Sequence, residues 1–349
     1  MSGPARVVDE SADPALDAGV IVAEPLVEWN GWQAVRRHGG VAILPWRGDH
    51  LAATAEKISN RSDGKVPEGS FSQVLVRIQK GREATWQTLH EAWRALAPGG
   101  RLLLTGSNEL GIVTWVKRLA AALQQPVEVL ANHSRARVAL FHRSAKPLQL
   151  AQGEVKTVPL WSATHAHPLP PSMVIPPGVF SHGVLDGGTA LLVARLAEEN
   201  LSPSPSRILD IGCGGGHLGL NALLRWPQAH ACFVDADARA IDAVRMNLSA
   251  HDLGLHARAT VTWWDVTEAL PMSGFDLVLA NPPCHAGTAV DFSVARAMFK
   301  QAMGALVSGG RLYVVANRQL PYEADLAALG KFETLSQNGG FKLLAVRRP

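Results

Sequence analysis

The stretch LDIGCGGGHLG (209–219) decides the fold. An apolar run ends there in an acid, and glycines follow it at alternating positions: Asp210, Gly212, Gly214 and Gly216. Glycines between a strand and a helix allow a tight turn and let the backbone approach a ligand closely. A dinucleotide-binding turn would need another glycine at the sixth position from Gly212, where this chain has His217. The stretch predicts an α/β domain with a ligand at its first turn and disfavours a nicotinamide cofactor.

Around this turn, apolar β-branched runs alternate with segments of helical periodicity. Buried strands are predicted at 207–211, 231–235, 260–264, 275–280 and 311–316. Helices are predicted at 237–251 and 291–306. This alternation is typical of a parallel, doubly wound sheet, in which ligands bind at the carboxyl ends of the strands. We therefore expect functional residues directly after each strand.

Acids stand at the tips of the next two strands. Asp235 comes 25 residues after Asp210, and an acid at that place can accept hydrogen bonds from both hydroxyls of a ribose. Asp265 ends the third predicted strand, where a cap for the following turn is the competing role.

The tetrapeptide Asn281-Pro282-Pro283-Cys284 carries the strongest chemical signal. Its prolines make the turn rigid, so the side-chain oxygen of Asn281 and the carbonyl oxygen of Pro282 can converge on one point. Two converging acceptors hold both hydrogens of an amino group. For an amino group conjugated to a ring, this favours a tetrahedral nitrogen and attack on an electrophilic methyl group. The competing interpretation is a turn that only ends the strand.

The two halves of the chain resemble each other. ALAPGGRLLL (95–104) matches ALVSGGRLYV (305–314), and FSQVLVRIQKG (71–81) aligns with FDLVLANPPCH (275–285). This similarity predicts a duplicated α/β domain. The first copy has no glycine-rich first turn, and Arg77 stands where the second copy has Asn281. We expect the first copy to have kept the scaffold and lost the chemistry.

Composition excludes several classes of protein. Apolar residues make up 47% of the chain and charged residues 18%, which argues against a disordered tail or a charged coiled coil. No run approaches the roughly 18 apolar residues of a membrane span, and the N-terminus lacks the basic start of a signal peptide. We therefore expect a cytoplasmic protein. The three cysteines have no metal-ligand spacing, so neither a disulfide framework nor a zinc site is predicted.

Charge and proline content divide the chain. Residues 29–150 hold 17 Lys and Arg against 8 Asp and Glu, a net +9, whereas residues 151–349 hold 15 against 16, a net −1. The excess suits contact with a polyanion, and scattered solvated arginines are the alternative. Five prolines in 164–178 place the domain junction at 150–165. The predicted parts are a loosely ordered segment (1–28), a degenerate domain (29–155) and a catalytic domain (165–349).

On the glycine turn and the Asn-Pro-Pro turn, the chain resembles the class I S-adenosylmethionine-dependent methyltransferases. Within that class it is similar to bacterial rRNA guanine-N2 methyltransferases of the RsmC type. The segments that carry this resemblance are PPGVFSHGVLDGGTALL (176–192), NPPCHAG (281–287), VVANRQLPY (314–322) and GGFKLLAVRR (339–348). The resemblance covers most of residues 70–349, more strongly in the second half.

The resemblance implies S-adenosylmethionine as the cofactor and assigns roles to residues. Asp210, Gly212, Gly214 and Gly216 would hold the methionine part, Asp235 the ribose and Asp265 the adenine. Asn281, Pro282 and Pro283 would form the catalytic turn that orients the target amine, with Asn281 also touching the cofactor.

Cys284 departs from the family pattern, which has Phe at this position. A thiol cannot stack on a purine, a contact worth roughly 1–3 kcal/mol per base. Either another ring substitutes for it or turnover suffers, and the candidate rings are Phe292, Phe180 and His285. We expect His285 to form a pocket wall or a hydrogen bond, and Phe180 to pack in the core near the cofactor. A tolerated change without consequence is the alternative for Cys284.

The resemblance thus implies a monomeric, metal-free enzyme that methylates N2 of a guanine in ribosomal RNA, with 16S rRNA of the small subunit favoured. Its first domain would bind ribosomal RNA or a ribosomal subunit, and it would have no membrane partner. Two alternatives stay open. One is methylation of glutamine N5 in a protein, and the other is a non-catalytic RNA-binding or ribosome assembly factor.

Overall fold

In the computed structural model the chain forms two compact units, Met1–Glu154 and Val155–Pro349. The structure describes residues 20–23, 35, 39–63, 65–144, 150, 152–160, 172–250, 254–283 and 292–349. The division between the units falls inside the interval 150–165 that the proline-rich segment predicted. In the described parts no helix is long and apolar enough to cross a membrane.

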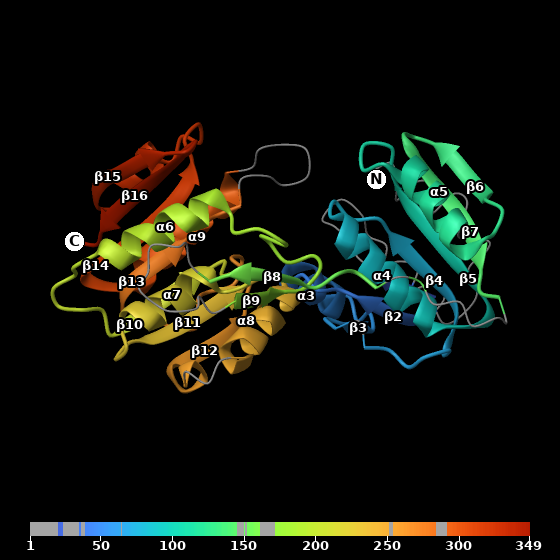
Figure 1. The fold of residues 1–349 in the computed structure, drawn as a ribbon, viewed down its shortest axis with the longest axis horizontal. Helices are drawn as coiled ribbons and strands as arrows, with labels where there is room; N and C mark the ends of the chain where they lie inside the picture. Colours follow the sequence, from blue (N-terminus) through green and yellow to red (C-terminus); the bar gives the residue numbers. More distant parts are fainter. Residues whose placement is uncertain are drawn as a thin grey trace. The chain divides into compact units, whose positions relative to one another are not determined.

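The second unit is built on a seven-stranded sheet with the order β12-β11-β10-β13-β14-β16-β15 (Figure 1). Its strands are β10 (Arg207–Ile211), β11 (His230–Asp235), β12 (Ala259–Trp263), β13 (Phe275–Ala280), β14 (Leu306–Asn317), β15 (Lys331–Asn338) and β16 (Phe341–Arg347). The first five pair in parallel, which confirms the predicted doubly wound sheet. β16 is antiparallel to both β14 and β15. Gly339 and Gly340 both have positive φ and form the two-residue hairpin turn between β15 and β16.

Helices cover both faces of this sheet. They are α6 (Gly187–Glu198), α7 (His217–Arg225), α8 (Ala238–Ala250), α9 (Ser293–Ala305) and α10 (Glu323–Ala327), with a 3-10 turn η2 (Leu255–Arg258) before β12. Residues of α6, α7 and α8 share one core cluster with Ile208, and residues of α9 and α10 share the other with its neighbour Leu209. Successive residues of β10 therefore enter opposite cores, which explains why the central strands β10 and β13 are largely apolar.

The second unit begins earlier than the sequence predicted. β8 (Lys156–Pro159) and β9 (Ser172–Ile175) form a separate two-stranded sheet, and their buried side chains belong to the core of this unit. Asn247 of α8, which is fully buried, accepts from the backbone N–H of Val174 at 2.8 Å and donates to its carbonyl at 3.0 Å. The expected start at residue 165 is therefore too late, because prolines conceal a short strand pair.

The first unit repeats the strand order of the second, with β3-β2-β1-β4-β5-β7-β6 (Figure 1). Its strands are β1 (Val20–Ala23), β2 (Gly40–Ile43), β3 (Asn60–Arg61), β4 (Phe71–Arg77), β5 (Leu96–Ser107), β6 (Glu128–His133) and β7 (Ala136–His142). Its described helices of more than one residue are α3 (Arg47–Ala55), α4 (Arg82–Ala95) and α5 (Ile112–Leu123). The chain is thus a tandem of two α/β domains with one topology, as its internal similarity predicted.

One sequence-based boundary in this unit is wrong. Residues 1–28 were expected to be loosely ordered, yet Val20–Ala23 forms the inner strand β1, paired in parallel with β2 and β4. The first domain therefore begins before residue 29. The signal was the short apolar run VIVA, which acidic and small residues surround.

Candidate active site

The carboxyl ends of the central strands bring the predicted residues together. Ile211 pairs with Ala280 in the parallel β10–β13 ladder, so Gly212 and Asn281 leave the sheet side by side. The N–H of Gly212 donates to the carbonyl of Val234 at 2.9 Å, which places the turn next to the end of β11. The residues that the sequence singled out after β10 and β13 therefore lie together at one edge of the sheet.

The glycine turn requires glycines for two physical reasons. Gly212, Gly214 and Gly216 have φ of +70°, +52° and +94°, which side chains other than glycine rarely adopt. Elsewhere the reason is close packing, since a Cβ added to Gly219 would lie 2.3 Å from the Phe233 ring. The turn therefore fixes the backbone at the entrance of α7.

Asp210 lies fully buried beneath this turn. Its Oδ2 accepts a hydrogen bond from the N–H of Gly219 at 2.8 Å, while its Oδ1 is buried without a partner among the described residues. Burial raises the pKa of the Asp210 carboxyl to about 8. A buried polar atom without a partner calls for a ligand or a water molecule to satisfy it.

Asp235 holds the other side of the turn. Its Oδ2 accepts from the N–H of Gly214 at 2.8 Å, and its Oδ1 accepts from the N–H of Asp237 at 2.9 Å. Burial raises the pKa of the Asp235 carboxyl to about 6. A carboxylate oxygen can accept a second hydrogen bond, so Asp235 can support the turn and receive a ligand hydroxyl together.

Asp265 performs the role that competed with adenine binding. Its Oδ1 accepts from the N–H of Thr267 at 2.9 Å and from the Thr267 hydroxyl at 2.5 Å. The carboxylate therefore caps the turn that follows β12. Its contact with an adenine stays a prediction.

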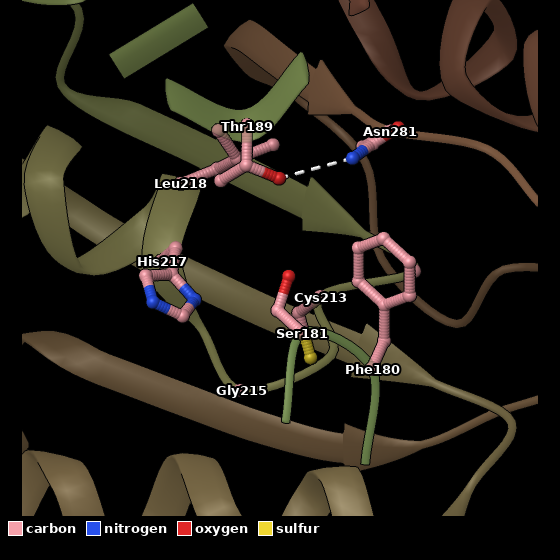
Figure 2. Close-up of a pocket in the computed structure, with 9 residues that line it drawn as sticks. Phe180, Ser181, Thr189, Cys213, Gly215, His217, Leu218 and Asn281 are labelled. Carbon is pink, nitrogen blue, oxygen red and sulfur yellow. Dashed lines mark hydrogen bonds between the residues drawn. The ribbon is translucent and has the colours of Figure 1, made fainter. Parts of the chain in front are cut away.

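Asn281 is held through its amide nitrogen. Nδ2 donates to Asp186 Oδ2 and to Thr189 Oγ1, both at 3.0 Å. Figure 2 shows this nitrogen directed at Thr189 and the amide oxygen on the far side. Among the described residues no hydrogen bond ends on Asn281 Oδ1. Pro282, which follows, is buried, and Pro283 is exposed.

A small pocket opens beside this amide (Figure 2). Its lining combines the glycine turn with polar and apolar side chains from separate segments: Phe180, Ser181, Thr189, Gly212, Cys213, Gly215, His217, Leu218 and Asn281. His217 is 4% exposed, and its Nε2 is buried without a partner in the part of the chain that the structure describes. Burial lowers the pKa of His217 to about 4, so the ring is neutral at pH 7.

The candidate rings for the place of Cys284 lie in different surroundings. Phe180 was expected to pack in the core, but it is 60% exposed and lines the pocket, so that expectation is wrong. The reason is its place on the loop before α6, outside any strand or helix. Phe292 instead packs edge-to-face on Tyr322 at 5.9 Å, outside the residues that line the pocket. Cys284 and His285 lie outside the described residues.

Known proteins match the chain over both halves. Residues 172–345 match the model of the methyltransferase small domain family. Ribosomal RNA small subunit methyltransferase C of Pseudomonas paraeruginosa is 31% identical over 346 residues, which cover 97% of this chain and 96% of that protein. The chain belongs to the family of ribosomal RNA small subunit methyltransferase C.

Two further relatives extend the comparison. Ribosomal RNA large subunit methyltransferase G of Shewanella amazonensis is 32% identical over 283 residues, 79% of this chain and 70% of that protein. The solved structure of the T. thermophilus 16S rRNA N2 G1207 methyltransferase, in complex with AdoMet and guanosine, has a TM-score of 0.82 at 26% identity. It covers 98% of this chain and 92% of that one. The likeness to this solved structure therefore extends over the first unit as well as the second.

Sequence reasoning in this methyltransferase missed three polar residues of the site. Asp186 and Thr189 entered the sequence analysis only as part of segment 176–192, which resembles the family. His217 entered it only as the residue that stands where a dinucleotide-binding turn needs a glycine. A signal existed for Asp186, because an Asp just before an apolar run is typical of a capped helix start. No sequence signal shows that this cap meets Asn281, since the two segments are more than 90 residues apart.

The described residues contain no set of side chains that could bind a metal ion. No group of three or more His, Cys, Asp and Glu side chains lies close enough there to hold an ion. Cys213 and Cys232 are buried free thiols.

Proposed function

We propose that this protein transfers a methyl group from S-adenosylmethionine to the exocyclic N2 of a guanine in ribosomal RNA, with 16S rRNA favoured. The observation that carries the proposal is the orientation of the Asn281 amide beside the glycine turn. Its Nδ2 donates to Asp186 and Thr189, so its Oδ1 points away from these two residues. The T. thermophilus relative, whose structure holds AdoMet and guanosine, supports the same assignment.

The residues present fit the cofactor. Its amino group, directly or through water, would satisfy the unpartnered Oδ1 of Asp210. The glycines of the turn would lie under the methionine part, Asp235 would accept from the ribose hydroxyls, and Asp265 would face the adenine. When bound, the cofactor supplies an electrophilic methyl group on a sulfonium.

The chain's own part in the reaction is to position an amine. Asn281 Oδ1 and the Pro282 carbonyl accept the two N–H bonds of the guanine amino group and hold them out of the ring plane. The same two oxygens stabilise positive charge that develops on the nitrogen. No strong base is needed in the site, because the nitrogen that gains the methyl group from the sulfur can release one of its protons to water. Burial lowers the pKa of His217 to about 4, so its neutral ring would be only a weak base.

Phe180 supplies the ring that Cys284 lacks. It is the large exposed aromatic residue among the pocket residues, and base stacking on such a ring contributes roughly 1–3 kcal/mol. We expect Phe180→Leu to raise the KM for RNA more than it lowers kcat.

The first unit is the RNA-binding scaffold in this proposal. Its net +9 over residues 29–150 includes the arginines Arg82 and Arg135, whose side chains are 69% and 88% exposed. Exposed cations of this kind contact phosphates without reading sequence. A target in ribosomal RNA would place the work of the protein in the cytoplasm.

The deciding experiment measures transfer of labelled methyl groups to 16S rRNA, 23S rRNA, 30S particles and 50S particles from cells that lack this protein. We expect N2-methylguanosine in one rRNA, lost in Asn281→Ala and kept in the control Asn338→Ala, an exposed Asn in β15. Label on glutamine of a protein would favour the protein-methylating alternative. Cofactor binding with no label on any substrate would overturn the proposal.

A further inference from the structure

We infer that Asp186 and Thr189 are positioning residues that give Asn281 its catalytic orientation. They do so by admitting only the NH2 side of its amide, so that Oδ1 faces the target amine. This inference rests on the proposed function, because it concerns how the same site receives the guanine amino group.

The hydrogen bonds among the three side chains have one consistent direction. Asp186 Oδ2 accepts from the Thr189 N–H at 2.8 Å and from the Thr189 hydroxyl at 3.2 Å. Because that hydroxyl has a single proton, its oxygen is left to accept from Asn281 Nδ2 at 3.0 Å. Asn281 Nδ2 also donates to Asp186 Oδ2 at 3.0 Å. Both neighbours of the amide therefore act as acceptors.

This arrangement decides which end of Asn281 is available. An ionised carboxylate is only an acceptor, so turning the amide over would set its oxygen against Asp186 Oδ2 and forfeit two hydrogen bonds. An Asn side chain alone has no such preference, since its two ends have nearly the same shape. If NH2 faced the guanine amino group, two donors would meet and no hydrogen bond would form. Asp186 and Thr189 therefore bind the donor end of the Asn281 amide and leave its acceptor oxygen for the target amine.

The fold holds this pair firmly. Asp186 is the N-cap of α6, and Thr189 is 5% exposed. Cβ atoms added to Gly187 and Gly188 would lie 2.8 and 2.9 Å from ring atoms of Phe341. The first turn of α6 therefore packs directly on β16, and the side chains that it carries cannot shift without moving that contact.

Asp186→Asn tests the inference with the least change of shape. Asn caps a helix about as well as Asp, but its own NH2 can now face Asn281 and let that amide turn over. We expect kcat to fall roughly tenfold to a hundredfold, from the loss of one or two hydrogen bonds to a charged group. The Kd for S-adenosylmethionine and the Tm should stay the same. A Kd raised by the same factor as the loss in kcat would overturn the inference.

Thr189 gives a matched pair of variants. Thr189→Val removes the hydroxyl at nearly constant volume and should lower kcat, whereas Thr189→Ser keeps the hydroxyl and should restore it. Equal kcat in the two variants would contradict the inference.

The sharpest test combines Asp186→Asn with Asn281→Asp. The single change Asn281→Asp sets two carboxylates together. In the double variant the amide at position 186 can donate to the carboxylate at position 281, which still offers an oxygen to the target. We expect the double variant to exceed the kcat of Asn281→Asp, and additive losses would overturn the inference. Wild-type protein in the same assay separates the two claims, because its failure to methylate rRNA would overturn the proposed function itself.

Discussion

The two units of this protein share details that strand order alone does not require. In the second unit the ladder between β13 and β14 shifts register between Phe275 and Leu277, and in the first unit the β4–β5 ladder shifts between Phe71 and Gln73. An arginine after the last strand fills the same place in each. Arg348 donates to the carbonyls of Leu306 and Gly304, and Arg143 donates to those of Leu96 and Arg94.

The units differ where strands end. At equivalent positions the first unit has Arg77 and the second has Asn281. The hairpin between the last two strands turns at Ser134 and Arg135 in the first unit and at Gly339 and Gly340 in the second. A fold of this kind depends on residues within the strands, whereas chemistry depends on residues just beyond them. One unit could therefore lose its chemistry and keep its fold.

Exchanging the equivalent residues should give the largest difference. Asn281→Arg replaces the acceptor by a group with donors only, so we expect kcat to fall by about 10²–10³ or more. Arg77→Asn should leave kcat for methyl transfer within about twofold, since the proposed function places every reacting group in the second unit. Steady-state kinetics with saturating substrate measures both. Equal losses would show that the first unit shares in the chemistry.

The stability of the second unit should depend on pH through its buried acids. The folded state keeps a proton on Asp210 up to about pH 8, whereas the unfolded chain loses it near the ordinary value of 3.8. Stability from this group is therefore full at acid pH and is lost as pH rises toward 8. Hydrogen exchange of β10 amides in the cofactor-free protein should show this loss, and Asp210→Asn should weaken it. An unchanged pH profile in that variant would contradict the prediction.

Removing the shared arginine should destabilise each unit to a similar degree. Arg348→Gln and Arg143→Gln each take donors from partly buried carbonyls, at a cost of about 1–3 kcal/mol in unfolding free energy. Hydrogen exchange of β14 and β5 amides reports the two units separately. A loss confined to one unit would break the equivalence between the two arginines.

The smallest effect belongs to the hairpin turn. Ser134 and Arg135 have φ of +52° and +55°, a region that costs side chains other than glycine about 1–2 kcal/mol per residue. Giving the first unit the sequence Asn-Gly at these positions should stabilise it by roughly 0.5–1 kcal/mol. Protection of β6 and β7 amides from exchange should rise accordingly. Gly340→Arg in the second unit should have the opposite effect.

Much of the fold could be predicted because its signals are local. The apolar runs at 207–211 and 275–280 coincide with β10 and β13, since a strand buried on both faces must be apolar along its length. The C-terminal hairpin was not predicted as two strands, because its partly exposed strand β15 is largely polar. The strands β1 and β8 were also not predicted, because a run of four residues shows little periodicity.

The sequence by itself determined the doubly wound fold, its duplication and the residues beyond the strand ends, because glycine turns and Asn-Pro-Pro are read over a few residues. Only the tertiary structure decided which end of Asn281 is offered to a ligand. It brings Asp186 and Thr189 against that amide from a helix more than 90 residues away. The direction of a hydrogen bond depends on the partner across the space, and no local pattern encodes that partner.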